Sequence, residues 1–514
     1  MIRIVLLLFS VIITYSCTNV KKYNAGLEKR LAPEKLQADV DFANKKLQKL
    51  HPNLYWYIEK PMLDYKFDSL KQSINKPLTP PEFFSKLAPV IASVREGHLR
   101  LVPPTKLLTK KEAKKLEQQK GIFSRMNYVV SGDRLYIKDN AEKYEDLKVG
   151  TEILKIHDIP TKDLLNNYRT YFSGDGFNTT FKEAYLAKIW ASYFTVQQGI
   201  LDSIKVEIKA GNTITEKYLH REYIPKEVKK EQKKVIASIK KNESTKTKDY
   251  NPISKSFNRD LQFLGGDSTI AYMKIKTFSG KLSSDFYRKS FKELQKRKSS
   301  TLILDVRDNL GGSLSEIHNL YSYLTTEEFK FIEDIEITKP TSIFHADYLN
   351  NFPEILKPIG VIGYPIYAVG MGLSVKKHNG KTYLRNNTIF TLKKPKKEAF
   401  QGKIYLLINS TSFSASAILA SKLKNDKRAV LVGEETGGAN DGTVAGRYAT
   451  IKLPNSKLYL PIGLMLIKPS ISFSNKKRGV FPDVLISPTT SDILSKKDLS
   501  LDYIFKELGI SNSK

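Results

Sequence analysis

The sequence predicts an α/β protein that combines an N-terminal helical region, a β-rich module and an α/β core with a partly parallel sheet. Three patterns support this prediction. Apolar residues recur at three- and four-residue steps over 31–99. Short apolar runs separated by turn residues follow over 128–223, and strand-like and helix-like segments alternate over 268–486.

The chain has 514 residues, which corresponds to roughly three domains of ordinary size. Its composition, 41% hydrophobic and 27% charged, is close to that of soluble globular proteins and excludes a wholly disordered chain or a multi-span membrane protein. We expect the following division: an export signal at 1–17, a helical domain at 30–110, a β-rich domain with a helical insertion at 125–224, a Lys-rich linker at 225–256, an α/β core at 257–490 and a tail at 491–514.

The start of the chain predicts export. After the basic start at Arg3, an almost continuous apolar run over 4–15 has the length of a signal-peptide core and is too short to span a bilayer. The only cysteine, Cys17, follows at once and resembles the acylated cysteine of a bacterial lipobox. We therefore expect an exported protein of the bacterial cell envelope, held through a lipid on Cys17 and facing the periplasm. A plain cleaved signal is the alternative.

The helical region is expected to hold two long helices. Leu36 and Leu47 belong to the apolar face of the first helix, which Pro52 ends. Thr79 is a suitable N-cap for the second helix, whose first turn tolerates the two prolines that follow.

The β-rich module is expected to contain strands at 134–137 and within 147–156, and a hairpin across Gly211 and Asn212. Residues 164–194 read as a helical insertion, and the Lys- and Glu-rich stretch at 226–248 reads as a linker or a solvated helix without a function of its own.

The formal net charge of +31 permits binding to nucleic acid or to anionic lipid. The excess consists mostly of lysines spread along the whole chain, without an Arg-rich arm or zinc-finger spacing. We therefore expect a solvated lysine surface and no nucleic-acid partner, with contact to the membrane only through the N-terminal lipid.

The core is expected to contain four strands and three helices; the strands lie at 270–275, 301–306, 404–408 and 429–432, and the helices at 286–294, 315–324 and 415–423. In open α/β sheets, sites form beyond the carboxyl ends of strands. One such end leads into Gly311 and Gly312, whose amides can approach a ligand oxygen closely. Another leads through the hydroxyl-rich stretch 409–416 into a helix, where a serine can face a cleft or simply cap the helix.

Four segments taken together resemble the C-terminal processing (tail-specific) serine peptidase family, in its His-bearing, tricorn-core-like branch found among bacterial envelope lipoproteins. They are Val94-Arg95-Glu96-Gly97-His98-Leu99-Arg100-Leu101, residues 305–312, residues 412–416 and Gly433-Glu434-Glu435-Thr436-Gly437-Gly438. The resemblance covers most of the chain, and it implies that the β-rich domain is PDZ-like and captures a polypeptide substrate by strand addition.

The resemblance also implies residue roles. Ser414 falls at the nucleophile, and the amides of Ala415 and of Gly311 or Gly312 at the oxyanion hole. The tail-specific members use a lysine base at a position that holds Ala439 here, so the base implied is His98 of the Gly-His segment.

Glu434 and Glu435, which follow a strand near Ser414, are the candidates for the acid that orients the base. The sequence contains no Gly-rich phosphate loop and no His-Glu-x-x-His motif, and a single cysteine excludes a thiolate-rich metal site, so we expect no cofactor and no metal.

The sequence therefore predicts a serine endopeptidase that acts through an acyl-enzyme. Two alternatives stay open: a catalytically inactive, peptide-binding scaffold lipoprotein of the same fold, and an esterase with the same Ser–His chemistry.

Overall fold

The structure is a computed structural model; it describes residues 20–140, 147–224, 249–251, 256–264, 269–280, 283–339, 361, 363–365, 369–370, 372–385, 391–473 and 477–510. The predicted signal with Cys17 and most of the Lys-rich linker lie outside the described residues. Within the described residues, no helix is both long and apolar enough to cross a membrane.

The N-terminal part consists of helices, as predicted: α2 (Val20–Glu28), α3 (Pro33–Leu50), α4 (Lys60–Ser73), α5 (Pro80–Ala92) and α6 (Lys110–Leu116). Leu36 and Leu47 lie on the buried face of α3, as their spacing indicates. Helix α5 begins with a capping box, in which Thr79 accepts from the amide of Glu82 and the Glu82 carboxylate accepts from the amide of Thr79.

The β-rich module is an antiparallel sheet in the order β2-β3-β4-β6-β7, with the short strand β5 (Ile159–Pro160) beside β4. Its strands are β2 (Met126–Ser131), β3 (Arg134–Asn140), β4 (Glu152–Ile156), β6 (Ser203–Ala210) and β7 (Thr213–His220). The predicted insertion forms two helices, α7 (Thr161–Tyr168) and α8 (Phe181–Gln198). The predicted hairpin across Gly211 joins β6 to β7.

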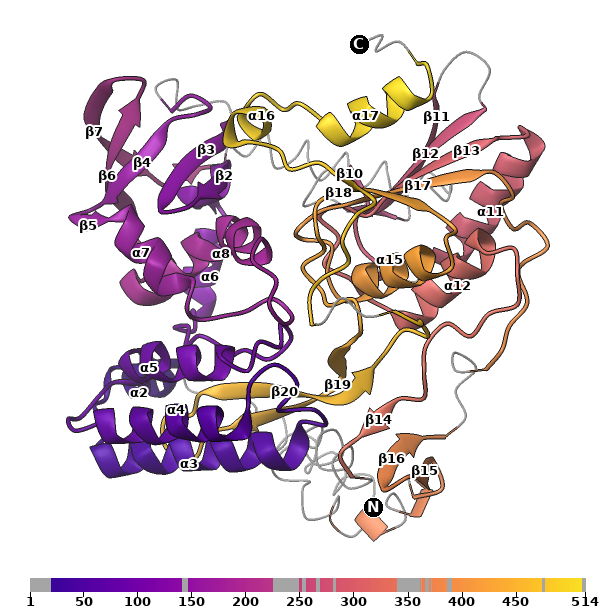
Figure 1. Cartoon of the computed structure of the whole chain (residues 1–514). Helices are drawn as coiled ribbons and strands as arrows, with labels where there is room; N and C mark the ends of the chain where they lie inside the picture. Colours follow the sequence, from indigo (N-terminus) through magenta and orange to yellow (C-terminus); the bar gives the residue numbers. More distant parts are fainter. Residues whose placement is uncertain are drawn as a thin grey trace, which may run out of the picture.

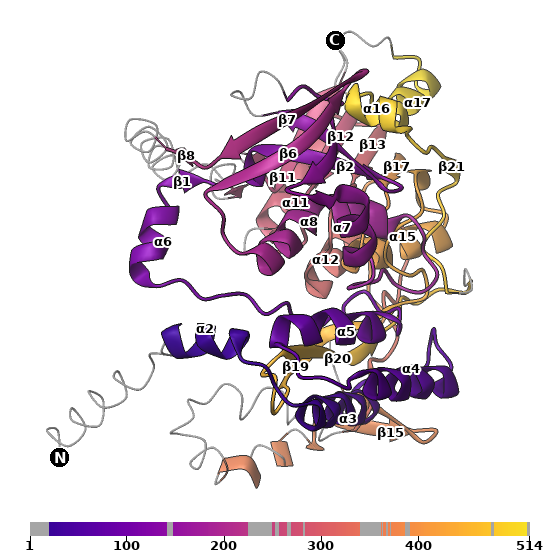
Figure 2. The same cartoon turned by 90° about the vertical axis from the view of Figure 1, so that its left-hand side faces the viewer.

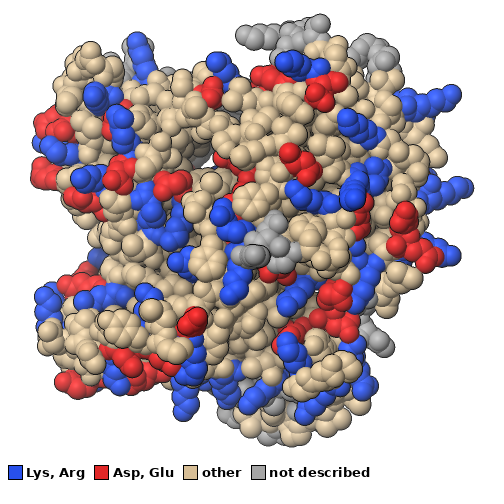
Figure 3. Space-filling view, in the orientation of Figure 1, with Lys and Arg blue, Asp and Glu red and all other residues tan. Residues whose placement is uncertain are grey.

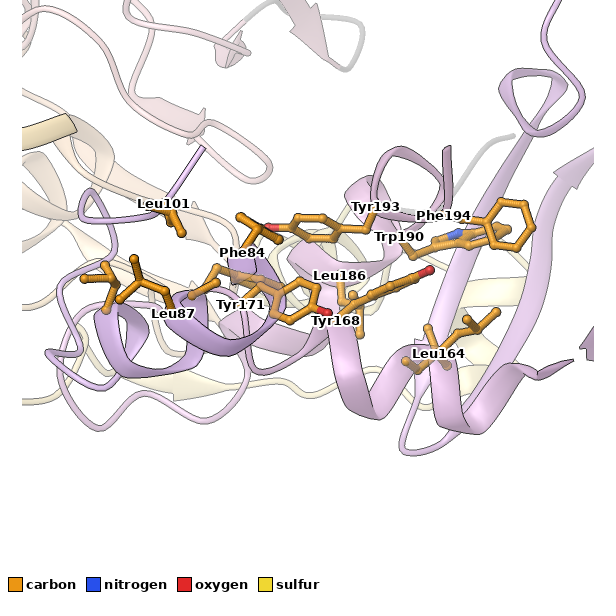
Figure 4. Close-up of a cluster of buried hydrophobic side chains, with 14 of the residues drawn as sticks. Phe84, Leu87, Leu101, Leu164, Tyr168, Tyr171, Leu186, Trp190, Tyr193 and Phe194 are labelled. Atoms are coloured by element: carbon orange, nitrogen blue, oxygen red, sulfur yellow. The ribbon is translucent and has the colours of Figure 1, made fainter. Parts of the chain in front are cut away.

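The helical region and the β-rich module share one hydrophobic core, although the sequence suggests two separate domains. Phe84 of α5 meets Tyr171 edge-on, with ring centroids 5.1 Å apart, and Tyr171 meets Tyr193 of α8 at 5.4 Å. Figure 4 shows these rings lying between the helices, together with Leu87 and Trp190. The large apolar faces of α5 and α8 are therefore buried against each other.

The core of the C-terminal half is a six-stranded sheet in the order β11-β12-β13-β17-β18-β21, parallel throughout except for β11. The strands are β11 (Arg259–Leu264), β12 (Ile270–Ile275), β13 (Thr301–Asp305), β17 (Lys403–Ile408), β18 (Val430–Gly433) and β21 (Val484–Leu485). Helices α11 (Ser283–Lys296), α12 (Leu314–Leu324) and α15 (Ala415–Asn425) cover one face (Figure 1). The predicted α/β class with a partly parallel sheet is confirmed.

The segment expected to be a tail contains two helices, α16 (Thr490–Leu494) and α17 (Leu499–Glu507). Ile504 of α17 is fully buried against Ile303 and Tyr405, which point away from the other helices. Arg307 also donates two hydrogen bonds to Asp498, at 2.6 and 2.8 Å. The second apolar face of the sheet needs a cover, and α17 supplies it (Figure 1).

A second sheet joins the two halves of the molecule, in the order β15-β16-β14-β20-β19. Its strands are β14 (Glu336–Ile337), β15 (Val375–His378), β16 (Lys381–Leu384), β19 (Thr443–Lys452) and β20 (Tyr459–Ile467). The β19–β20 hairpin runs along the N-terminal helices (Figures 1 and 2), and Leu460 and Ile462 enter their core. The remaining short elements are β1 (Gln119–Lys120) paired with β8 (Glu222–Tyr223), β9 (Tyr250–Asn251) paired with β10 (Ser256–Phe257), and a 3-10 turn at Phe123–Arg125.

The charged side chains on the face shown in Figure 3 are interspersed in sign, with lysines and arginines next to acidic residues. The large positive net charge does not gather into one continuous basic strip on this face. This distribution agrees with a solvated lysine surface.

Asp39 of α3 fixes the tip of the hairpin to the N-terminal helices. Its carboxylate is fully buried and accepts from the amide of Asn455 at 2.9 Å and from the amide and hydroxyl of Ser456 at 2.7 and 2.6 Å. A buried carboxylate is stable only when such donors replace water.

We expect Asp39→Ala to lower the free energy of unfolding by about 3 kcal/mol, because several charge-assisted hydrogen bonds are lost inside the protein. Urea denaturation measures the change. Asp41→Ala is the matched control: Asp41 lies on the same helix in an exposed ion pair with Lys71, and its loss costs less than about 1 kcal/mol. Equal effects of the two substitutions would contradict the assignment.

Candidate active site

Two loops meet at the carboxyl ends of the neighbouring strands β13 and β17. The Ser412 hydroxyl donates to the carbonyl of Val306 at 2.9 Å, and the Ser416 hydroxyl donates to the carbonyl of Asn309 at 2.8 Å. The amide of Phe413 also donates to Asn309 O at 3.1 Å. These bonds fix the hydroxyl-rich turn against the glycine loop, at the edge where the sequence predicts a site.

Ser414 differs from the other hydroxyl residues of its turn. It has φ 55° and ψ −119°, a conformation that costs energy for any residue with a Cβ. It lies at the N-cap of α15, yet its side chain makes no capping hydrogen bond. The hydroxyl is therefore directed away from its own helix.

His98 is the partner of the Ser414 hydroxyl. Its Nε2 lies 3.1 Å from Ser414 Oγ, across 316 residues of sequence. The imidazole packs on the ring of Phe413, with centroids 4.8 Å apart. Gly97 allows this contact, because a Cβ at that position would lie 2.5 Å from the Phe413 ring. The structure thus brings together the two residues that the resemblance implies as nucleophile and base.

Thr443, the first residue of β19, determines which imidazole nitrogen carries the proton. Its hydroxyl lies 3.0 Å from His98 Nδ1 and 2.9 Å from Glu96 Oε1. The hydroxyl has one proton, and a carboxylate oxygen is the acceptor for it, so the hydroxyl accepts from His98 Nδ1–H. The unprotonated Nε2 then faces Ser414, as a general base requires.

Glu96 is the carboxyl group behind the imidazole. Its Oε1 is 3.8 Å from His98 Nδ1, too far for a direct hydrogen bond, and it also accepts from the amide of Val444 at 3.2 Å. Asp175, between α7 and α8, lies beside it in side-chain hydrogen-bond contact, and both groups are buried.

Burial governs the titration of this cluster. It raises the pKa of Glu96 to about 7 and raises the pKa of Asp175 well above its usual value, with the neighbouring Glu96 charge as a further cause. Burial also lowers the pKa of His98, which keeps the imidazole neutral. Ligand atoms of Glu96, His98 and Asp175 lie within 4.8 Å of one another, a spacing open to a metal ion, but Thr443 already occupies the imidazole nitrogen.

The structure gives Glu434 and Glu435, the predicted acids, other partners than His98. Glu435 is bound by Arg478, at 3.0 and 2.5 Å, and by the amide of Gly479 at 2.8 Å, so it stabilises the loop after β18. Glu434 bonds Ser410 instead, and burial raises its pKa. Glu96 is the glutamate that lies next to the imidazole and to Thr443.

Two of the amides that the resemblance assigns to the oxyanion hole make no hydrogen bond within the described residues. The amide of Gly311 donates to Asn309 Oδ1 at 2.9 Å and is therefore engaged. Among the described residues, the amides of Gly312 and of Ala415 meet no protein acceptor. Gly311 lets the loop close on the turn, because a Cβ there would lie 2.7 Å from Ser414 Cβ and 2.9 Å from Ala415 N. The start of α15 adds its positive dipole end.

Three site residues are not assigned from the sequence: Glu96, Asp175 and Thr443. Glu96 stands two residues before His98, and a carboxyl group so close to a candidate base is a usable signal. Asp175 and Thr443 carry no such signal, because only the folded chain brings them to the imidazole.

Comparisons with known proteins identify a family match in the core and a similar overall fold. Residues 269–486 match the family model described as Peptidase family S41. The crystal structure of mature CPAF is similar over 92% of this chain and 96% of its own, at 17% identity and a TM-score of 0.59. The structure of mature CPAF complexed with lactacystin is similar over 92% of this chain and 97% of its own, at 16% identity and a TM-score of 0.58. The photosystem II D1 C-terminal processing protease is similar over 88% of this chain and 93% of its own, at 14% identity and a TM-score of 0.41. No curated protein sequence matches the chain.

The chain is therefore a serine-type peptidase, as its α/β core and the matched segment indicate. The segment 269–486, which includes the strands β13 and β17 and the Ser414 turn, belongs to peptidase family S41.

The carboxyl pair makes stability depend on pH. The pKa of Glu96 is higher in the folded state than in the unfolded chain. Its contribution to the free energy of unfolding is therefore complete below the ordinary pKa of 4.5 and is lost as pH rises through about 7. We expect the urea midpoint of the wild type to fall over this range, and that of Glu96→Gln to fall less. Parallel curves for the two proteins would show that Glu96 is not the titrating group.

Proposed function

We propose that the protein is an exported endopeptidase in which Ser414 is the nucleophile and His98 the general base. The contact of 3.1 Å between Nε2 and Oγ carries this proposal. The tautomer imposed by Thr443 supports it, because it leaves Nε2 free to accept the serine proton.

In the first half of the reaction, Ser414 Oγ attacks the peptide carbonyl carbon while its proton passes to His98 Nε2. The carbonyl oxygen becomes an anion that the amides of Gly312 and Ala415 bind. The imidazolium donates Nδ1–H to Thr443, whose hydroxyl donates to the Glu96 carboxylate. His98 then protonates the leaving amine, and the acyl-enzyme forms. Water attacks the ester by the same route in reverse and releases the acid and free Ser414.

A polypeptide substrate fits the surroundings of this site. A cleft of 650 Å³ lies between β2, α8 and the carboxyl ends of the core strands, and its lining includes Val130, Lys188, Asp308 and Thr411. Strand β2 is the edge of its sheet, so an extended segment can add to it, as in PDZ-like peptide capture. Such a segment would lie next to the loop that carries Ser414.

The inactive scaffold and the esterase are the competing functions. A scaffold has no use for a strained Ser414 or for a hydroxyl that fixes the imidazole tautomer, so these two features favour the enzyme. The esterase shares all of the proposed chemistry and differs only in its substrate.

We expect Ser414→Ala to abolish covalent labelling by a fluorophosphonate and hydrolysis of labelled casein, and His98→Ala to lower both by about 100-fold or more. Ser416→Ala is the matched control, because that hydroxyl is occupied by Asn309 O, and it keeps labelling. Gel fluorescence measures the label, and circular dichroism verifies folding. A folded wild type that takes up no label favours the scaffold; labelling with ester but not casein hydrolysis favours the esterase.

We also propose that Cys17 carries a lipid that anchors the protein to the envelope. The basic start, the apolar run and the position of the only cysteine support this proposal. No further membrane contact is required.

We expect Cys17→Ala to move the protein from the membrane fraction to the soluble fraction of the cells that express it, because alanine cannot carry the lipid that anchors the protein. Immunoblots of the two fractions measure the shift. An unchanged membrane fraction would contradict the lipid anchor and leave the peptidase assignment intact.

A further inference from the structure

Asp175 is a buried carboxyl group with an environment built around it. It lies in the loop that connects α7 to α8, and its side chain is fully buried. Oδ1 accepts from the amide of Gly97 at 2.7 Å, and Oδ2 accepts from the amide of Ala439 at 3.3 Å. Asp175 therefore connects the segment that carries His98 to the turn that precedes Thr443.

The Asp175 side chain also contacts the carboxyl group of Glu96. Glu96 Oε1 is saturated by two donors, the Thr443 hydroxyl and the Val444 amide. Glu96 Oε2 is buried and meets no N–H or hydroxyl group of the described residues. Two ionised carboxylates do not share a buried contact, so one of the pair carries a proton.

The surroundings of the pair indicate which group is protonated. Both carboxyl groups accept two hydrogen bonds from protein donors. A proton on Asp175 gives Glu96 Oε2 the donor that it lacks, and burial, with the Glu96 charge as a further cause, raises the pKa of Asp175 well above its usual value. The other titratable groups that act on the pair are Tyr57, Tyr448, Asp441 and His98, and Arg100 acts on His98.

We propose that Asp175 is a positioning residue that stays protonated and donates its O–H to Glu96, which leaves a single negative charge behind His98. The inference rests on the proposed function of Ser414 and His98. As Ser414 gives up its proton, that charge stabilises the imidazolium through Thr443. The ionisation of Glu96, rather than that of His98 alone, then sets the acid limb of the rate.

The test compares two substitutions of similar shape. The amide of Asp175→Asn can donate to Glu96 as a protonated carboxyl does, so we expect its fluorophosphonate labelling rate to stay within about threefold of wild type at the high-pH plateau, with the acid midpoint no higher. Asp175→Leu has no donor, so we expect its acid midpoint to rise by about one pH unit.

The measurement is the second-order labelling rate as a function of pH, with thermal melting followed on the same samples. Asp39→Asn is the control: it changes a carboxyl group of equal burial on α3, and we expect lower stability with an unmoved midpoint. If Asp175→Leu does not fold, the labelling rate of Asp175→Asn alone tests whether Asp175 is protonated.

A folded Asp175→Asn protein whose labelling rate is about tenfold or more below wild type at every pH overturns the inference, since Asp175 would then be needed as an ionised carboxylate. A folded Asp175→Leu protein with the wild-type midpoint also overturns it. Labelling of Ser414→Ala at the wild-type rate would instead overturn the proposed function itself, so the two failures are distinguishable.

Discussion

The structure of the site depends on the burial of two carboxyl groups at the junction of three chain segments. Glu96 precedes the imidazole, Asp175 comes from the β-rich module, and Thr443 begins the hairpin that returns from the core. Neither carboxyl group is tolerable inside a protein without donors, and each segment supplies donors to another. The same hydrogen bonds therefore assemble the molecule and aim His98 at Ser414.

The parts of this protein that sequence patterns could predict are local. Apolar spacing indicates α3, a capping box begins α5, and strand–loop–helix order indicates that Gly311 and the Ser414 turn lie at one edge of a sheet. The family resemblance adds His98. Glu434 and Glu435 are predicted as the acid because they follow a strand near Ser414, whereas the fold pairs Glu435 with Arg478 and places Glu96 behind the imidazole.

Domain boundaries illustrate the same limit. The chain between the N-terminal helices and the β-rich module reads as a division, but the aromatic side chains of α5 and α8 form one core across it. Likewise, residues beyond 490 read as a tail because nothing local shows that the second face of the sheet needs Ile504. Burial against a distant surface leaves only a faint trace in sequence, since any amphipathic helix would show the same pattern.

The long separation of base and nucleophile has a consequence for the life of the enzyme. His98 is synthesised 316 residues before Ser414, and Thr443, which bonds its Nδ1, comes later still. A chain that is still being synthesised therefore contains only part of the site. The site is complete only when the β19–β20 hairpin has docked, because Thr443 at the start of β19 is the last of its residues to be synthesised.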